Sequence, residues 1–178
     1  MGAALAQRLA AQHPSRVRSL VSAMGLPADA AGIRMLSYLR FGNLRRMGGP
    51  SRLQGDDDEI QRLVDTALLI ASPGYEFDEQ WARHVAETSH ARSPRDPTAS
   101  QRQMAAARVA PPTLASIVAP TLVISGFDDP IISPKGGVDT ADRIPRAAFL
   151  GYHGMGHHFP RELWGSIASS VAANAARG

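Results

Sequence analysis

Two stretches, PTLVISGFDDP at residues 120–130 and AAFLGYHGMGHH at residues 147–158, decide the fold of this 178-residue chain. The first opens with a short apolar run bounded by turn residues, which is typical of a strand buried on both faces, and the second opens with another strand-like run. We therefore predict strands over 120–126 and 147–152, with a helix around 136–143 between them. A strand, a crossover helix and a second strand imply parallel pairing, so the sequence predicts an α/β fold.

The chain divides into three zones, residues 1–26, 27–111 and 112–178. The alanine- and leucine-rich start of the first zone predicts a short helix. This helix should end two residues before Pro14, because a proline disfavours helical geometry at the residue that precedes it. The apolar residues of Val17–Ala23 then predict a short strand, which brings the expected sheet to about three strands.

The zone over residues 27–111 predicts a helical region. An acidic run at Asp56–Asp58 precedes apolar residues at the i, i+3, i+4 spacing of an amphipathic helix. Adjacent carboxylates on a helix point apart, so we interpret this run as a solvated helix start and not as a metal site. After a break at Pro73-Gly74, further helices are expected from residue 77 to 85 and over 98–108.

The amino-acid composition excludes several classes of protein and of site. The chain is 44% hydrophobic and 20% charged, and it contains no cysteine. Disulfides, thiolate metal sites and a cysteine nucleophile are therefore excluded. No window approaches the ~20 apolar residues of a membrane span, and the start of the chain lacks the charged region of a secretory signal. We expect a soluble cytoplasmic protein with no membrane partner.

The basic charge does not indicate nucleic-acid binding. The formal net charge is +3, and 18 of the 19 basic residues are arginine. These arginines are scattered along the chain, with Arg45-Arg46 as the adjacent pair, and aromatic residues make up 6% of the sequence. A nucleic-acid surface needs basic residues gathered on one face with aromatics among them. We expect no nucleic-acid partner.

Carboxylates follow the first of these two predicted strands, and imidazoles follow the second. Asp128 and Asp129 come after the first strand, and His157 and His158 come after the second. Sites in open α/β sheets form beyond the carboxyl ends of the strands, and an acid that orients a histidine is the supporting half of a nucleophile–base–acid site. Spacing alone leaves the alternative open that the aspartates form a turn and the histidines are structural.

Residues 120–137 and 144–164 resemble the C-terminal part of the α/β-hydrolase family, in which a strand and Gly-x-x-Asp precede a strand and a Gly-His pair. Residues 1–21 resemble the helix after that family's nucleophile elbow and the strand that follows it. Residues 27–111 are similar to the family's variable helical cap in character. The resemblance implies the C-terminal part of an α/β-hydrolase sheet, with about three parallel strands and an inserted helical cap.

The resemblance also implies two catalytic residues. Asp129 completes the Gly-x-x-Asp pattern and matches the family's acid. His157 completes the Gly-His pair and matches the family's catalytic base. Asp128 falls at a position that the family leaves variable and is the weaker candidate. His153 and His158 are interpreted as loop residues.

The nucleophile of the family sits in the elbow G-x-S-x-G, of which Met1 and Gly2 match the last two residues. The serine would be the residue before Met1, and the backbone nitrogen of Met1 would be an oxyanion donor. Ser22, Ser125 and Ser133 lie on no such elbow and are not expected to replace it. We therefore expect an N-terminally truncated hydrolase, inactive as the chain stands.

The resemblance implies that the complete protein is a serine hydrolase acting on an ester or similar bond of a small, fairly apolar molecule, with no metal or organic cofactor; whether the chain as given is an enzyme stays open. The alternative is a non-catalytic, hydrolase-like binding protein or a gene remnant. The strand over Val17–Ala23 would present an unpaired edge, so we also expect self-association. Candidate pocket-lining residues are Met24, Leu36, Leu39, Phe41, Met47, Phe77 and Trp81.

Overall fold

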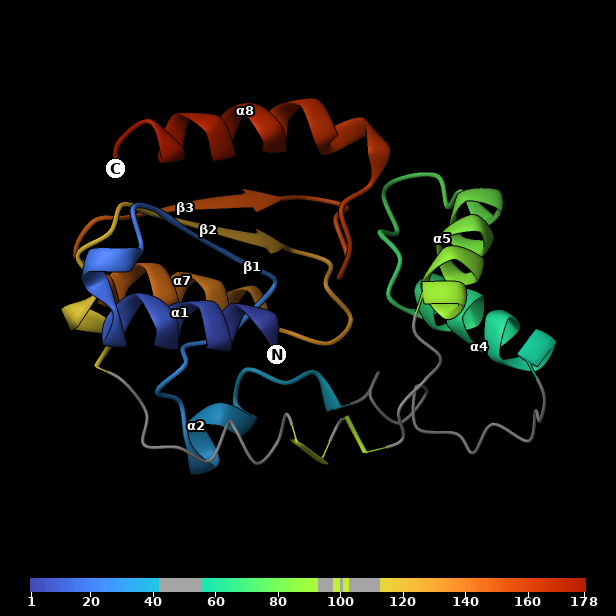
Figure 1. The fold of residues 1–178 in the computed structure, drawn as a ribbon, viewed down its shortest axis with the longest axis horizontal. Helices are drawn as coiled ribbons and strands as arrows, with labels where there is room; N and C mark the ends of the chain where they lie inside the picture. Colours follow the sequence, from blue (N-terminus) through green and yellow to red (C-terminus); the bar gives the residue numbers. More distant parts are fainter. Residues whose placement is uncertain (42–55, 93–97, 100, 103–112) are drawn as a thin grey trace.

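The computed structural model describes residues 1–41, 56–92, 98–99, 101–102 and 113–178 (Figure 1). Within these residues the helices are α1 (Gly2–Gln12), α2 (Gly32–Leu36), α4 (Asp56–Leu69), α5 (Glu79–Arg92), α7 (Pro134–Arg143) and α8 (Trp164–Ala175). The strands are β1 (Leu20–Ala23), β2 (Thr121–Gly126) and β3 (Ala147–Tyr152), and short 3₁₀ turns are η1 (Pro14–Arg16), η2 (Leu114–Ser116) and η3 (Arg161–Leu163).

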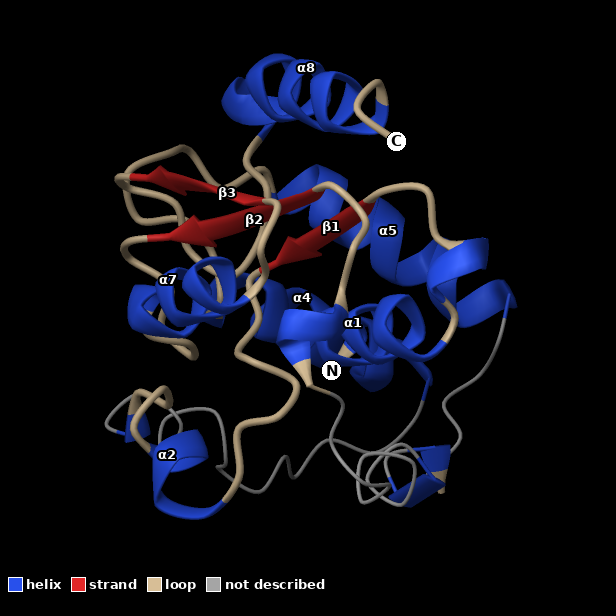
Figure 2. Ribbon diagram, turned by 90° about the vertical axis from the view of Figure 1, so that its left-hand side faces the viewer, coloured by secondary structure: helices blue, strands red, loops and turns tan. Residues whose placement is uncertain are grey.

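The three strands form one parallel sheet in the order β1-β2-β3. Thr121 of β2 stands in register with Leu20 on one side and with Ala147 on the other. Helices α1 and α7 cover one face of this sheet, and α8 covers the other (Figures 1 and 2). Every residue of β2 is buried, because the strand lies between two strands and two helical layers. The predicted α/β class, the buried strand and the crossover helix are confirmed.

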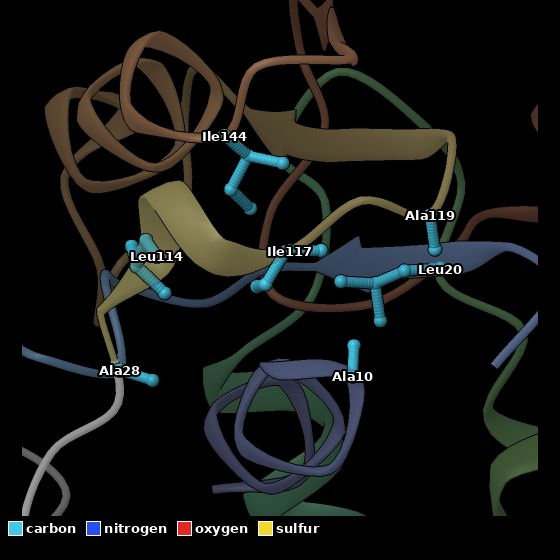
Figure 3. Close-up of a cluster of buried hydrophobic side chains, with 7 residues drawn as sticks. All are labelled: Ala10, Leu20, Ala28, Leu114, Ile117, Ala119 and Ile144. Carbon is cyan, nitrogen blue, oxygen red and sulfur yellow. The ribbon is translucent and has the colours of Figure 1, made fainter. Parts of the chain in front are cut away.

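Apolar side chains fill both faces of the sheet. The cluster on the α1 face, drawn in Figure 3, comprises Ala10, Leu20, Ala28, Leu114, Ile117, Ala119 and Ile144. The cluster beneath α8 is built around Leu122, Ile124, Met155 and Ile167. Alternate residues of a strand point to opposite faces, so Leu122 and Ile124 of β2 share the α8 side. The two clusters fix the sheet, and with it the turns at the ends of β2 and β3.

The first strand is shorter than predicted. The sequence pattern extends over Val17–Ala23, whereas β1 covers Leu20–Ala23. The nitrogen of Leu20 donates to the carbonyl of Pro120 at 2.9 Å, directly before β2 begins. Residues 17–19 have no neighbouring strand beside them, and Val17, the apolar residue among them, packs against the core cluster without strand pairing.

Helices α4 and α5 pack against each other beyond the carboxyl ends of the strands (Figure 1). Helix α4 starts at Asp56 as predicted, but α5 starts at Glu79 and not at residue 77. The carboxylate of Asp78 accepts a hydrogen bond from the nitrogen of Trp81 at 2.8 Å, which is the geometry of a helix N-cap. Residues 70–78 form a non-helical connection between the two helices, so this zone is less helical than predicted.

Some expectations fall outside the part that the structure describes. Most of the helix predicted over 98–108 lies there, as do Arg45, Arg46 and the candidate pocket residue Met47. Across the described ranges, none of the helices has both the length and the apolar character that crossing a bilayer requires.

Candidate active site

The turns after β2 and β3 bring Asp129 and His157 together. His157 Nδ1 lies 2.6 Å from the Oδ2 atom of Asp129, across 28 residues of chain. Asp129 is 1% exposed, whereas the His157 side chain is 27% exposed. The parallel order β2-β3 is the cause, because it places both strand ends, and the turns that follow them, at the same edge of the sheet. One partner is thus fixed inside the protein while the other reaches the surface.

The turn itself holds the Asp129 carboxylate. Its second oxygen, Oδ1, accepts hydrogen bonds from the nitrogens of Ile131 at 2.7 Å and Ile132 at 2.9 Å. Three donors, two backbone nitrogens and one imidazole, therefore satisfy a carboxylate that is out of contact with water. This arrangement leaves Asp129 little freedom to rotate.

The contact decides which nitrogen of His157 is available for chemistry. An ionised carboxylate can only accept hydrogen bonds, so the proton in the His157–Asp129 bond belongs to Nδ1. In the neutral ring, Nε2 is then the unprotonated nitrogen and can take a proton from another group. A fixed tautomer with a free Nε2 is what a general base requires.

The neighbouring residue, Asp128, has a different contact. It is exposed, and its Oδ2 accepts a hydrogen bond from the nitrogen of Gly154 at 2.7 Å. This bond ties the turn after β2 to the turn after β3 without reaching His157. Asp128 is therefore a link between the two turns, and Asp129 is the residue paired with the imidazole.

The two turns approach each other more closely than side chains would allow. A Cβ atom on Gly126 would lie 2.1 Å from the carbonyl oxygen of Met155, so only glycine fits there. Gly154 has a φ of +75°, in the left-handed region that glycine adopts without strain. These two glycines allow the turn that carries His157 to fold over the end of β2.

The other two histidines of this turn have separate surroundings. The ring of His153 is exposed and packs on Phe127, with 4.5 Å between the ring centroids. His158 Nδ1 lies 3.1 Å from the hydroxyl of Ser72. Burial lowers the pKa of His158, and the charge of Glu162 acts weakly in the opposite direction. Neither histidine contacts Asp129 in the hydrogen bonds of the described residues.

Sequence reasoning missed Ser72. The dipeptide that follows it, Pro73-Gly74, indicates only a break between helices, and nothing near position 72 points to a partner 86 residues further along the chain. In the structure Ser72 is 2% exposed, and its hydroxyl contacts both Gly156 and His158, the neighbours of His157. A sequence signal for this contact is absent because the contact is wholly tertiary.

The three serines considered as replacement nucleophiles lie elsewhere. Ser22 is 1% exposed and accepts a hydrogen bond from Gln7 Nε2 at 2.9 Å. Ser125 is buried within β2, and Ser133 is the N-cap residue of α7. In the described part of the chain, the side-chain hydrogen bond of His157 is with Asp129, and no bond joins it to a serine.

Met1 is the N-cap residue of α1 and is 57% exposed. Figure 1 shows the N-terminus near the end of the sheet at which the strands terminate. The first backbone nitrogens of a helix are unpaired, and the helix dipole there favours negative charge. The start of α1 thus has the polarity that an oxyanion site needs, on the same side of the sheet as His157.

A cavity of about 700 Å³ lies between the α4–α5 pair and residues 158–164. Its wall is largely apolar and aromatic, and among the predicted pocket residues Phe77 and Trp81 line it. Arg161 closes one side: its guanidinium packs over Trp81 and Trp164 and lies 3.5 Å from the Asp78 carboxylate. The cavity adjoins His158, one residue from His157.

The remaining predicted pocket residues do not line this cavity. Met24 packs in the cluster beneath α8, with a φ of 49° at the end of β1. Leu39 forms an isolated antiparallel bridge with Ile132, and Leu36 and Phe41 are exposed. Their apolar character therefore reflects packing or surface positions. Among the described residues, no three histidine, aspartate or glutamate side chains gather as metal ligands.

Comparison with known proteins finds relatives of the same fold. The model of the alpha/beta hydrolase fold family matches residues 1–160. Rhodomycin D methylesterase DauP of Streptomyces sp. (strain C5) is 28% identical over 192 residues, a match that covers 98% of this chain and 64% of the relative. This chain thus spans less than two thirds of the length of that relative.

Solved structures show the same fold. A putative lipase from Acinetobacter baumannii AYE matches with a TM-score of 0.63 and 16% identity, over 99% of this chain and 59% of that one. The enol-lactonase from Burkholderia xenovorans LB400 matches with a TM-score of 0.56 and 18% identity, over 98% of this chain and 62% of that one.

Proposed function

Because this chain belongs to the α/β-hydrolase fold family, we propose that Asp129 and His157 are the acid and base of an enzyme that hydrolyses an ester of a small molecule. The observation that carries the proposal is the 2.6 Å contact between Asp129 Oδ2 and His157 Nδ1. That contact holds the imidazole with Nε2 free, and the partial exposure of His157 leaves Nε2 within reach of a second group.

In the proposed reaction a serine hydroxyl loses its proton to His157 Nε2 as its oxygen attacks the ester carbonyl. Asp129 stabilises the imidazolium that forms, and the proton then passes to the departing alcohol. A water molecule next attacks the acyl-serine and gives its proton to Nε2. As the acyl–oxygen bond breaks, Nε2 returns that proton to the serine oxygen, which releases the acid and the free serine. A positioned base of this kind typically accelerates the reaction by roughly 10²–10⁴-fold.

We propose that the serine directly precedes Met1 in a longer form of the protein. The match of Met1-Gly2 to the end of the nucleophile elbow supports this, as does the start of α1 at Gly2. The backbone nitrogen of Met1 would then be an amide and one of the oxyanion donors. The greater length of the methylesterase relative is compatible with an additional N-terminal part. Under this proposal the 178-residue chain is inactive by itself.

The substrate is proposed to be a carboxylic ester with an apolar body. The support is the cavity beside His158, whose wall includes Phe77, Trp81 and Trp164, together with the methylesterase activity that the relative's name states. Residues 27–111 would act as the helical cap over this cavity, between the hydrolase segments 1–26 and 112–178. A cytoplasmic location and the absence of nucleic-acid and membrane partners stay predictions.

The proposal is tested by extending the chain at Met1 with an apolar strand and Gly-x-Ser. We expect the extended protein to hydrolyse short p-nitrophenyl esters, with release of p-nitrophenol as the measurement. His157→Ala should lower kcat by roughly 10³-fold or more, because the proton of the serine then has no acceptor. His13→Ala, at an exposed position after α1, is the control and should retain the activity.

If the extended protein binds an ester but does not turn it over, the alternative of a non-catalytic binding protein holds. Ligand binding can be followed by the fluorescence of Trp81 and Trp164, which line the cavity. Turnover that survives His157→Ala would rule out His157 as the base.

We also propose that the open edge of β1 makes the 178-residue chain self-associate. Leu20 and Met24 donate their N–H groups to the carbonyls of Pro120 and Ile124, so the N–H groups of Val21 and Ala23 point to the other edge. No strand pairs with that edge among the described residues. We expect sedimentation velocity to show a mass that rises with protein concentration.

Val21→Pro should reduce this association, because proline removes one outward N–H and keeps the bonds to β2. The control is Ile33→Lys, which removes the most exposed of the large apolar side chains described, at 87% exposure. Association abolished by Ile33→Lys and unchanged by Val21→Pro would show that the edge is not responsible.

A further inference from the structure

The turn that carries His157 is held from outside the sheet by residues 70–74, which follow α4 and are called here the return segment. The backbone nitrogen of His157 donates to the carbonyl of Ile70 at 2.9 Å. The nitrogen of Gly74 donates to the carbonyl of Gly154 at 3.0 Å. Two backbone hydrogen bonds, one at each end of the return segment, thus join it to the turn.

Ser72 lies between these two bonds and reaches both neighbours of His157. Its hydroxyl oxygen accepts a hydrogen bond from the nitrogen of Gly156 at 2.8 Å. The same oxygen lies 3.1 Å from His158 Nδ1 and 3.3 Å from the carbonyl oxygen of His158. A hydroxyl carries one proton, so Ser72 accepts from Gly156 and donates to one of the two acceptors of His158.

Close packing prevents the two segments from moving independently. A Cβ atom on Gly156 would lie 2.2 Å from the carbonyl oxygen of Ala71. A Cβ atom on Gly74 would lie 2.5 Å from the Cα atom of Gly154. The backbones touch at both places, so a shift of Ser72 is transmitted to the turn and to the imidazole that it carries.

We propose that Ser72 is a positioning residue, whose buried hydroxyl fixes the backbone on both sides of His157 and so keeps the imidazole aligned with Asp129. The inference rests on the proposed role of His157 as the base. Ser72 is not among the residues that line the cavity. Its burial, at 2% exposure, and its contacts with residues other than His157 distinguish it from a nucleophile.

The state of His158 fits this role. Burial lowers the pKa of His158, so its ring is neutral at neutral pH and Nδ1 can accept the proton of Ser72. The charge of Glu162 opposes this shift without being its main cause. Ser72 then has both of its hydrogen-bonding functions in use, and replacing it leaves a buried N–H of Gly156 without an acceptor.

The experiment compares Ser72→Ala and Ser72→Cys with Ser22→Ala in the extended protein described above. Ser22 is a matched control, because it is equally buried and also accepts one hydrogen bond, but from Gln7 of α1 and not from the turn that carries His157. The first readout is the downfield NMR signal of the His157 Nδ1 proton, which reports its bond to Asp129 without substrate. The second is the separate measurement of kcat and KM.

We expect Ser72→Ala to broaden or remove the Nδ1 signal and to lower kcat by about 10- to 100-fold with KM changed less than about threefold. Ser72→Cys has nearly the same shape and a weaker acceptor, so it should fold and give an intermediate loss. Ser22→Ala should lower the melting temperature and keep both the signal and kcat.

A wild-type Nδ1 signal and kcat in both Ser72 variants would overturn the proposal and leave Ser72 with a purely structural role. The NMR readout needs neither substrate nor nucleophile. Loss of the signal in an extended protein that never hydrolyses esters would therefore support Ser72 as a positioning residue while contradicting the proposed function.

Discussion

Replacing Asp129 by asparagine is expected to lower kcat for ester hydrolysis by about 10⁴-fold, the size of the same change in a serine-protease triad. Asp129 Oδ1 already accepts from the nitrogens of Ile131 and Ile132, so the oxygen of the new amide stays there. Its NH₂ group then faces His157 Nδ1, which must accept. The imidazole proton moves to Nε2, and Nε2 can no longer take a proton from the serine.

The measurement is kcat of Asp129→Asn in the extended protein, with its melting temperature recorded to show that it folds. Asp128→Asn is the comparison, because the new amide oxygen can still accept from the nitrogen of Gly154. We expect Asp128→Asn to lower kcat by less than about tenfold, which is the effect of weakening one hydrogen bond. Equal losses in the two variants would show that Asp129 has no special relation to His157.

The 178-residue chain alone is expected to give no measurable hydrolysis of p-nitrophenyl esters. Without a serine beside it, His157 has only water to deprotonate, and the described residues offer no serine bonded to its ring. A complete triad that loses one member retains roughly 10³–10⁴-fold catalysis over water through its oxyanion hole and substrate binding. Part of the oxyanion hole also depends on a peptide bond at Met1. Even this residual activity is therefore expected to be missing from the 178-residue chain.

A fluorophosphonate probe checks the same prediction by a second route. The extended protein should be labelled at the serine before Met1, and the 178-residue chain should not be labelled. Stoichiometric labelling of Ser22, Ser72, Ser125 or Ser133 in the short chain, together with turnover, would contradict the assignment of the nucleophile. Peptide mass spectrometry identifies which serine carries the label.

Local sequence patterns were sufficient for the elements of the sheet. Thr121–Gly126 was predictable as a strand because a short apolar run between turn residues can satisfy its backbone only by pairing on both sides. Ala147–Tyr152 was predictable from its own apolar run, although it forms an edge of the described sheet and is only partly buried. The helix between the two strands was predictable because parallel strands need a crossover connection. The start of α5 was misjudged because apolar periodicity extends back to Phe77, although Asp78 is a capping residue that sequence reasoning could have used.

The sequence by itself predicted that a carboxylate and an imidazole follow two successive strands joined by a crossover helix, because apolar runs and turn residues are local properties. Residue spacing did not distinguish Asp128 from Asp129, and the family resemblance favoured Asp129. The tertiary structure shows the two side chains with different partners, Asp129 with His157 and Asp128 with Gly154. It alone revealed Ser72, whose contacts join positions more than 80 residues apart. Such contacts depend on how α4 returns to the sheet, and no periodicity or motif along the chain encodes that approach.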